Sequence, residues 1–132
     1  MTLNARFKVD GFEPRQVAGL EADWVGLLTF AKTFTAGIIG HATTLFMSAG
    51  TEEGSRSYVA TERITGRLET GGEEGEEGEE GELTVQHGGL ESDPATWFGH
   101  IVPGTGTGPF KEWSGSARIV HDDEGAFFEI DL

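Results

Sequence analysis

Apolar and polar residues alternate along almost the whole of this chain, and that alternation restricts its fold more than any other feature. The segment from Ala5 to Val9 shows it clearly, and the segment from Leu83 to Gln86 repeats it in the middle of the chain. A period of two residues is that of a β-strand with one buried face. Since no segment shows sustained helical periodicity, the sequence predicts an all-β fold.

Turn residues divide the alternation into eight strand-like runs, and the 21 glycines supply positions for tight turns. Antiparallel strands in such number usually hide their edges by closing on themselves. We therefore predict one domain over residues 1–132, a closed antiparallel meander barrel of about eight strands. The predicted strands are Ala5–Val9, Trp24–Ala36, Ile38–Ala49, Arg56–Ile64, Leu83–Gln86, Ala95–Val102, Ser116–Val120 and Ala126–Leu132, and Gly11–Ala22 is predicted to be a loop.

Several short motifs occur in a characteristic order. They are Lys32-Thr33-Phe34 followed by Gly37, then Glu62-Arg63-Ile64-Thr65-Gly66, then Gln86-His87-Gly88-Gly89, and finally Trp97 followed by Val102-Pro103-Gly104-Thr105-Gly106-Thr107-Gly108. In this combination the chain resembles the bacterial family DUF3224, from about Ala5 to Leu132. The resemblance implies a closed barrel similar to that of allene oxide cyclase, a calycin-like architecture. It implies no activity, because the family has none assigned.

The charge of the chain excludes some partners. The net charge is −14, and nine Lys and Arg residues are scattered along the sequence. Such a surface repels nucleic-acid phosphates and anionic lipids, so we expect neither nucleic acid nor membrane as a partner. No apolar run follows Met1 and none reaches the length of a membrane helix, so a cytoplasmic protein is expected.

A Glu-Glu-Gly repeat occupies residues 71–81. Like charges and glycines oppose compact structure, so the sequence predicts a flexible, solvated hairpin loop there. Capture of Ca²⁺ is the functional alternative, although the spacing lacks the Asp/Asn pattern of a dedicated calcium loop. A use of this acidic loop in binding another protein also stays open.

The sequence predicts neither a metal site nor a cofactor. The chain has no cysteine, which excludes disulfides and thiolate chemistry. Its four histidines fall on four different predicted strands or strand ends, and no His-x-His pair is present.

Three ionisable residues share strand faces with apolar ones. Lys32 lies with Phe30 and Phe34, Glu62 with Tyr58 and Ile64, and His87 with Leu83 and Val85. If these faces line the barrel, Lys32, Glu62 and His87 point inward and are the candidates for catalysis. A register with Leu68 opposite Leu83 would make Glu62 the diagonal neighbour of His87. The apolar and aromatic residues predicted to point inward are Phe7, Val9, Phe30, Phe34, Tyr58, Leu83, Val85 and Trp97. The residues predicted to contact a ligand are Phe30, Phe34, Tyr58, Glu62, Val85, His87 and Trp97.

Two roles remain open for the inward polar residues. In the first, Lys32 and Glu62 form a structural ion pair and His87 is a hydrogen-bonded barrel residue. In the second, the three residues form a polar patch that orients a ligand or supplies an acid and a base. The second role predicts a barrel that binds a small, largely apolar molecule. The alternative is a cofactor-free cyclase or isomerase, which the resemblance implies by fold alone.

The predicted strand from Ala95 to Val102 is apolar on both faces. Phe98 and Val102 lie on the face opposite Trp97. An apolar barrel exterior is often covered by another subunit, so we expect a homodimer or a larger homo-oligomer.

Overall fold

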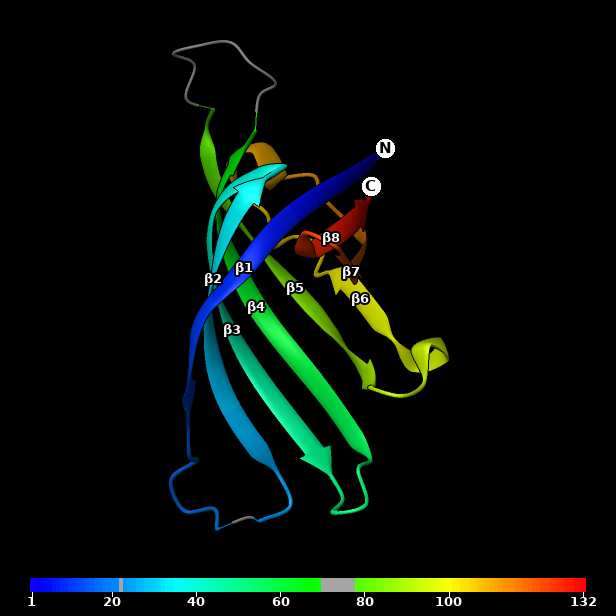
Figure 1. Cartoon of the computed structure of the whole chain (residues 1–132). Helices are drawn as coiled ribbons and strands as arrows, with labels where there is room; N and C mark the ends of the chain where they lie inside the picture. The colour runs from blue at the N-terminus through cyan, green and yellow to red at the C-terminus, as the bar shows by residue number, and fades with distance from the viewer. Residues whose placement is uncertain (22, 70–77) are drawn as a thin grey trace.

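The computed structural model describes residues 1–21, 23–69 and 78–132, and it is a closed barrel whose antiparallel strands are joined in chain order (Figure 1). The last strand pairs with the first, which confirms the predicted meander barrel. The strands are β1 (Thr2–Pro14), β2 (Gly26–Ala36), β3 (Ile38–Gly50), β4 (Arg56–Leu68), β5 (Glu80–Leu90), β6 (Phe98–Ile101), β7 (Gly115–Asp122) and β8 (Gly125–Asp131). In the described ranges the helical segments are two short 3-10 turns, η1 (Pro94–Thr96) and η2 (Gly108–Phe110), and no helix there could span a membrane.

Strand length differs between the two sides of the barrel. Strands β1, β3 and β4 have 13 residues each, whereas β6 has 4 and β8 has 7. Strand β8 pairs with β1 only from Thr2 to Phe7, so β1 beyond Phe7 pairs with β2 alone. The long strands therefore project past the short ones (Figure 1). We call the part where β8 meets β1 the closed end and the projecting part the open end.

Side chains fill the closed end. Phe7, Phe34 and Phe128 contact one another, with ring centroids 5.2 to 6.2 Å apart. Phe110 of η2 is fully buried and packs edge-on against Trp113 at 4.9 Å. The aliphatic residues buried with them are Ile38, Ile64, Leu83, Val85, Ile101 and Ile130. This end is thus a packed core.

Two glycine features predicted from the sequence shape the barrel. Gly37 forms the turn between β2 and β3, where its φ of 78° is a conformation that other residues rarely adopt. The segment before η2 lies directly against β5, with the Thr107 amide donating to the Glu82 carbonyl at 2.9 Å. A side chain at Gly81 would collide with the Thr107 backbone, so this close approach requires glycine. The glycine-rich segment therefore covers the closed end.

Strand β1 is longer than predicted, because residues expected in a loop pair with β2 as far as Pro14 and Leu28. A bulge between Val9 and Gly11 shifts the register there and disturbs the alternation of faces. Val9 lies before this bulge and pairs with the inward-facing Lys32, so it keeps its predicted face. It is nevertheless 51% exposed, because β8 does not extend along β1 beyond Phe7. Pro14 is tolerated because this part of β1 has one strand neighbour, so its missing amide hydrogen breaks no ladder.

The segment before β6 also differs from the prediction. Ala95 and Thr96 belong to η1 rather than to a strand, because Pro94 starts a turn and the Asp93 side chain accepts a hydrogen bond from the Ala95 amide at 3.2 Å. Strand β6 therefore begins only at Phe98.

The register between β4 and β5 differs by four residues from the predicted one, because Leu83 pairs with Ile64 and not with Leu68. An even shift keeps every side chain on its predicted face. Most of the loop predicted over residues 71–81 lies outside the described residues. Its last part, Glu80 and Gly81, belongs to β5.

Candidate functional site

Four polar side chains form a continuous chain of hydrogen bonds inside the barrel. Lys32 of β2, Glu62 of β4 and His87 of β5 are only 4%, 1% and 4% exposed, which confirms that they point inward. One carboxylate oxygen of Glu62, Oε1, lies 2.8 Å from Lys32 Nζ and 2.7 Å from His87 Nε2. The other ring nitrogen of His87, Nδ1, lies 3.0 Å from the hydroxyl of Tyr58 on β4. We call this chain the Lys32–Tyr58 relay.

Strand register explains how these residues meet. His87 pairs with Ala60 and Val85 pairs with Glu62, so Glu62 is the diagonal neighbour of His87, as predicted. Strand β3 separates Lys32 from Glu62, and its residue opposite Lys32 is Ala42. A small side chain at that position lets the long Lys32 side chain pass over β3 to the carboxylate.

Aromatic rings hold both ends of the relay. Lys32 Nζ lies 4.4 Å from the ring centre of Phe7 and 5.3 Å from that of Phe128, close enough for cation–π attraction. At the other end, Tyr58 stacks on Phe46 with ring centres 5.0 Å apart. The His87 ring meets Phe128 edge-on at 5.5 Å. The two rings that carry the Tyr58–His87 hydrogen bond are therefore fixed in orientation.

The surroundings determine which atoms carry protons. Burial raises the pKa of Glu62, but the His87 hydrogen bond and the Lys32 charge outweigh it, so the Glu62 pKa lies below its ordinary value. Burial and the Glu62 charge raise the pKa of Tyr58, which keeps the phenol protonated at neutral pH. A carboxylate only accepts hydrogen bonds, so His87 donates from Nε2. A neutral imidazole then accepts at Nδ1, and the Tyr58 hydroxyl donates to it.

Two buried oxygens have no hydrogen-bond partner within the described part of the chain, namely Thr44 Oγ1 and Glu62 Oε2. Thr44 and Glu62 are direct cross-strand partners on β3 and β4. The ionised state of Glu62 therefore depends on the two contacts made by Oε1.

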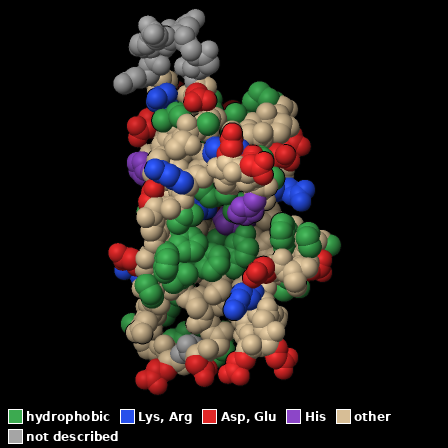
Figure 2. Space-filling view, viewed as in Figure 1, with side chains coloured by type: hydrophobic (Ala, Val, Ile, Leu, Met, Phe, Trp, Pro, Cys, Tyr) green, Lys and Arg blue, Asp and Glu red, His purple; other side chains and the backbone are tan. Residues whose placement is uncertain are grey.

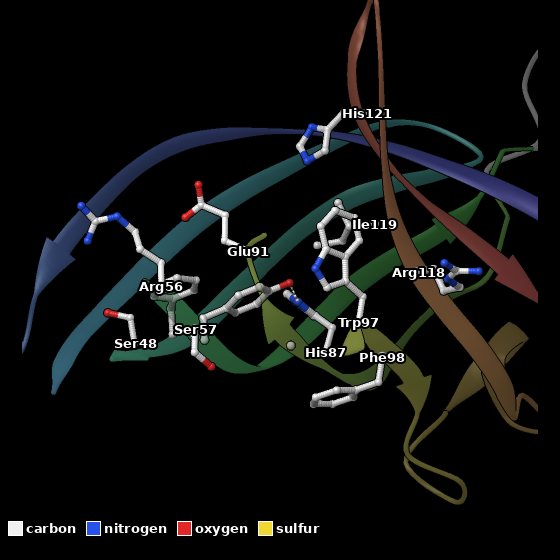
Figure 3. Close-up of a pocket in the computed structure, with 13 residues that line it drawn as sticks. Ser48, Arg56, Ser57, His87, Glu91, Trp97, Phe98, Arg118, Ile119 and His121 are labelled. Atoms are coloured by element: carbon white, nitrogen blue, oxygen red, sulfur yellow. Dashed lines mark hydrogen bonds between the residues drawn. The ribbon is translucent and has the colours of Figure 1, made fainter. Parts of the chain in front are cut away.

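A pocket of about 430 Å³ opens beside the relay at the open end of the barrel. Tyr58 and His87 line it, and Phe46, Trp97, Phe98 and Ile119 supply apolar walls. Figure 2 shows hydrophobic side chains gathered in a hollow on this face. Figure 3 shows the hydrogen bond at His87, and it shows Arg118 pointing away from the other labelled residues. Besides Tyr58 and His87, the charged or ionisable side chains that line the pocket are Arg56, Glu91, Arg118 and His121.

Comparison with known proteins places this barrel in a family. The sequence model of DUF3224, described as a protein of unknown function, matches residues 3–132. The chain belongs to the DUF3224 family. A crystal structure of a DUF3224 protein of unknown function from Shewanella oneidensis MR-1 has the same fold, with a TM-score of 0.72 and 22% identity over 100% of this chain and 98% of that one. Among curated proteins, none matches the chain.

The sequence-predicted ligand residues of this DUF3224 protein separate into two groups. Tyr58, His87 and Trp97 line the pocket, and Glu62 lies directly behind His87. Phe30 packs at a tilt against Phe46, with ring centres 5.0 Å apart, and is not among the residues that line the pocket. Phe34 and Val85 are buried in the closed end, away from the pocket.

Sequence reasoning missed other wall residues of the DUF3224 pocket, above all Phe46 and Ile119. Phe46 shares its strand face with Ala42 and Thr44, whereas the opposite face of β3 carries Leu45 and Met47 and is more apolar in sequence. That more apolar face lies outside, with Leu45 49% and Met47 45% exposed. Strand pairing counted from the Gly37 turn could have identified the inner face of β3. It sets Thr44 opposite Phe30, and Phe46 lies on the same face as Thr44.

The described residues of the DUF3224 chain contain no group of three His, Asp or Glu side chains placed to hold a metal ion. His87 lies inside the barrel, whereas His41, His100 and His121 are exposed. Among the polar side chains that line the pocket, the phenol of Tyr58 and the imidazole of His87 suit hydrogen bonding and proton transfer.

The raised pKa of Tyr58 leads to a direct test, because Tyr58 is the only tyrosine of the chain. In an ultraviolet absorbance titration, the phenol is expected to ionise at a higher pH than a free tyrosine. In Glu62→Gln the midpoint should fall, since the negative charge that opposes ionisation is gone. Equal midpoints for the two proteins and free tyrosine would contradict the relay geometry.

Proposed function

We propose that this DUF3224 protein binds a small, largely apolar molecule at the open end of the barrel, with a polar group of that molecule against Tyr58 and His87. The pocket of about 430 Å³, with apolar walls and one fixed pair of polar groups, carries this proposal. Cavities of this size and lining are typical of small-molecule sites.

Exposed aromatic surface supports the proposal. Trp97 and Phe98 are 42% and 44% exposed beside the pocket, although both are large apolar side chains. A bound molecule that covers them would remove apolar area from water, which stabilises a complex. The polar group of the ligand is expected to be a hydrogen-bond donor, since the Tyr58 oxygen has lone pairs free when its own proton is directed to His87.

The second candidate function is a cofactor-free isomerase or cyclase. The observation that favours it is the hydrogen-bonded series of Glu62, His87 and Tyr58. In this series a carboxylate orients an imidazole, and the imidazole contacts a hydroxyl beside the pocket. A walled pocket would also hold a flexible substrate in one conformation. The barrel fold alone does not favour this candidate, because one fold hosts many functions.

The binding proposal is tested with N-phenyl-1-naphthylamine, a neutral probe whose fluorescence rises in apolar sites. We expect saturable binding with one site per chain. Trp97→Ala should weaken it at least about tenfold, because the variant loses a large aromatic contact. Met47→Ala is the matched control, since Met47 is comparably exposed but lies on the outer face of β3.

Equal binding by the two variants would place the probe outside the pocket and contradict the proposal. Native mass spectrometry of the purified protein complements this test. It shows whether a small molecule co-purifies with the chain, and it gives the subunit number, which we propose to be two or more.

A further inference from the structure

We infer that Tyr58 passes a proton between the bound molecule and His87, whose imidazolium the Glu62 carboxylate stabilises, so that the pocket supports cofactor-free proton transfer. The substrate class is a small apolar molecule with an acidic hydrogen, namely a phenol, an enol or a carbon acid beside a carbonyl. This inference rests on the proposed function, because it requires a molecule in the pocket.

Hydrogen-bond direction is the first support. Glu62 accepts from His87 Nε2, and in the tautomer with its proton on Nε2 the His87 Nδ1 accepts the proton of the Tyr58 hydroxyl. The phenol oxygen then offers lone pairs to the pocket that Tyr58 and His87 line together. A ligand hydrogen directed at that oxygen meets a base that can release its own proton to the imidazole.

The transfer is balanced without a further reactant. The ligand X–H bond breaks, and its electron pair stays on the ligand as an enolate or phenolate. A new O–H bond forms at Tyr58 while the original hydroxyl proton moves to His87 Nδ1. Returning the proton to a different ligand atom reverses these bond changes and leaves an isomer. Nothing is oxidised or reduced.

The charges around His87 determine the free energy of moving the proton onto its ring. The Glu62 carboxylate at 2.7 Å stabilises the imidazolium, whereas Lys32 on β2 opposes it by sharing the same Glu62 oxygen. The Phe7 and Phe128 rings offset part of the Lys32 charge. The other ionisable groups around the pocket are Arg56 and Tyr58 on β4, Glu91 after β5, and Arg118 and His121 on β7. The ligand anion lies next to the imidazolium and compensates its charge.

A purely structural role does not account for the whole relay. Lys32 and Glu62 already neutralise each other at 2.8 Å in the interior. His87 and Tyr58 add no charge to that pair. His87 and Tyr58 instead connect the Lys32–Glu62 pair in the packed core to the wall of the pocket through two hydrogen bonds.

The test uses two probes of nearly equal shape, 4-nitrophenol and 4-nitroanisole. Only the phenol has a proton to give, and its ionisation changes its visible absorbance. In the wild-type protein, we expect the pKa of bound 4-nitrophenol to lie about one unit below its pKa in water. This difference is a tenfold change in the ionisation constant. Nitroanisole has no ionisable proton, so its absorbance when bound should not depend on pH through ionisation of the probe.

Two variants separate the relay from the pocket. Tyr58→Phe keeps the ring stacked on Phe46 but removes the hydroxyl, and His87→Gln keeps hydrogen-bonding groups but cannot take a proton. Both should lose the shift in 4-nitrophenol ionisation, and the nitroanisole affinity of each variant is measured alongside to separate that loss from a change in binding. Thr61→Val, on the outer face of β4, is the control and should keep the shift.

The outcomes distinguish the two claims. If nitroanisole binds and 4-nitrophenol ionises at the same pH in wild type and both variants, the relay inference is wrong and the binding proposal stands. If neither nitro compound nor N-phenyl-1-naphthylamine binds, the binding proposal fails and the relay inference falls with it.

Discussion

Glu62→Ala is expected to lower the free energy of unfolding by about 3–5 kcal/mol, the cost of removing one partner from a buried ion pair. The variant leaves the Lys32 ammonium, 4% exposed, without its carboxylate. It also leaves the His87 Nε2 hydrogen without an acceptor. Urea unfolding at neutral pH measures the effect.

The double variant Lys32→Met/Glu62→Gln is the control for this prediction. It removes both charges together, keeps similar volumes, and leaves an amide oxygen that can accept from His87. We expect it to recover much of the stability lost in Glu62→Ala, because no uncompensated charge stays buried. A Glu62→Ala protein within about 1 kcal/mol of wild type would show that the ion pair is not needed to balance Lys32.

Phe34→Ala is expected to cost about 3–5 kcal/mol, as for other large aromatic residues removed from a core. Phe34 is 1% exposed, and its ring contacts those of Phe7 and Phe128 at the closed end. Phe12→Ala is the matched control, since Phe12 is 65% exposed and makes an edge contact with Phe30 at the open end. We expect the control to cost less than about 1 kcal/mol in the same unfolding measurement. Similar losses for the two variants would contradict the division of the barrel into two ends.

Alternation and turn residues were enough to predict the barrel and the inward position of Lys32, Glu62 and His87. Side chains alternate between the two faces of a strand with a period of two residues. The error of four residues in the predicted β4–β5 register is an even number, so it left every side chain on its predicted face. The alternation also gave the face of Val9 but not its exposure, because that exposure results from the end of the β8 ladder at Phe7.

The site was less predictable than the fold. The Tyr58–His87 hydrogen bond depends on side-chain reach across a diagonal, which a strand pattern does not encode. The wall residue Phe46 was missed because β3 carries apolar residues on both faces, so hydrophobicity alone does not decide which face is inside. The pocket itself results from the shortness of β6 and β8, and the predicted strand from Ala95 to Val102 was twice as long as β6.

Unequal strand length has a consequence for how such barrels diverge. The ladder that closes the barrel runs between β8 and the first part of β1, and the residues that fill it lie there too. Phe46, Trp97 and Ile119 stand on the other side of the relay and contribute little to that core. Under the proposed binding function, substitutions at these three positions would change ligand choice while folding is maintained, so selection would act on affinity and on foldability separately. Family members that keep Lys32, Glu62 and His87 but differ at the pocket wall would then recognise different molecules with one shared proton-handling group.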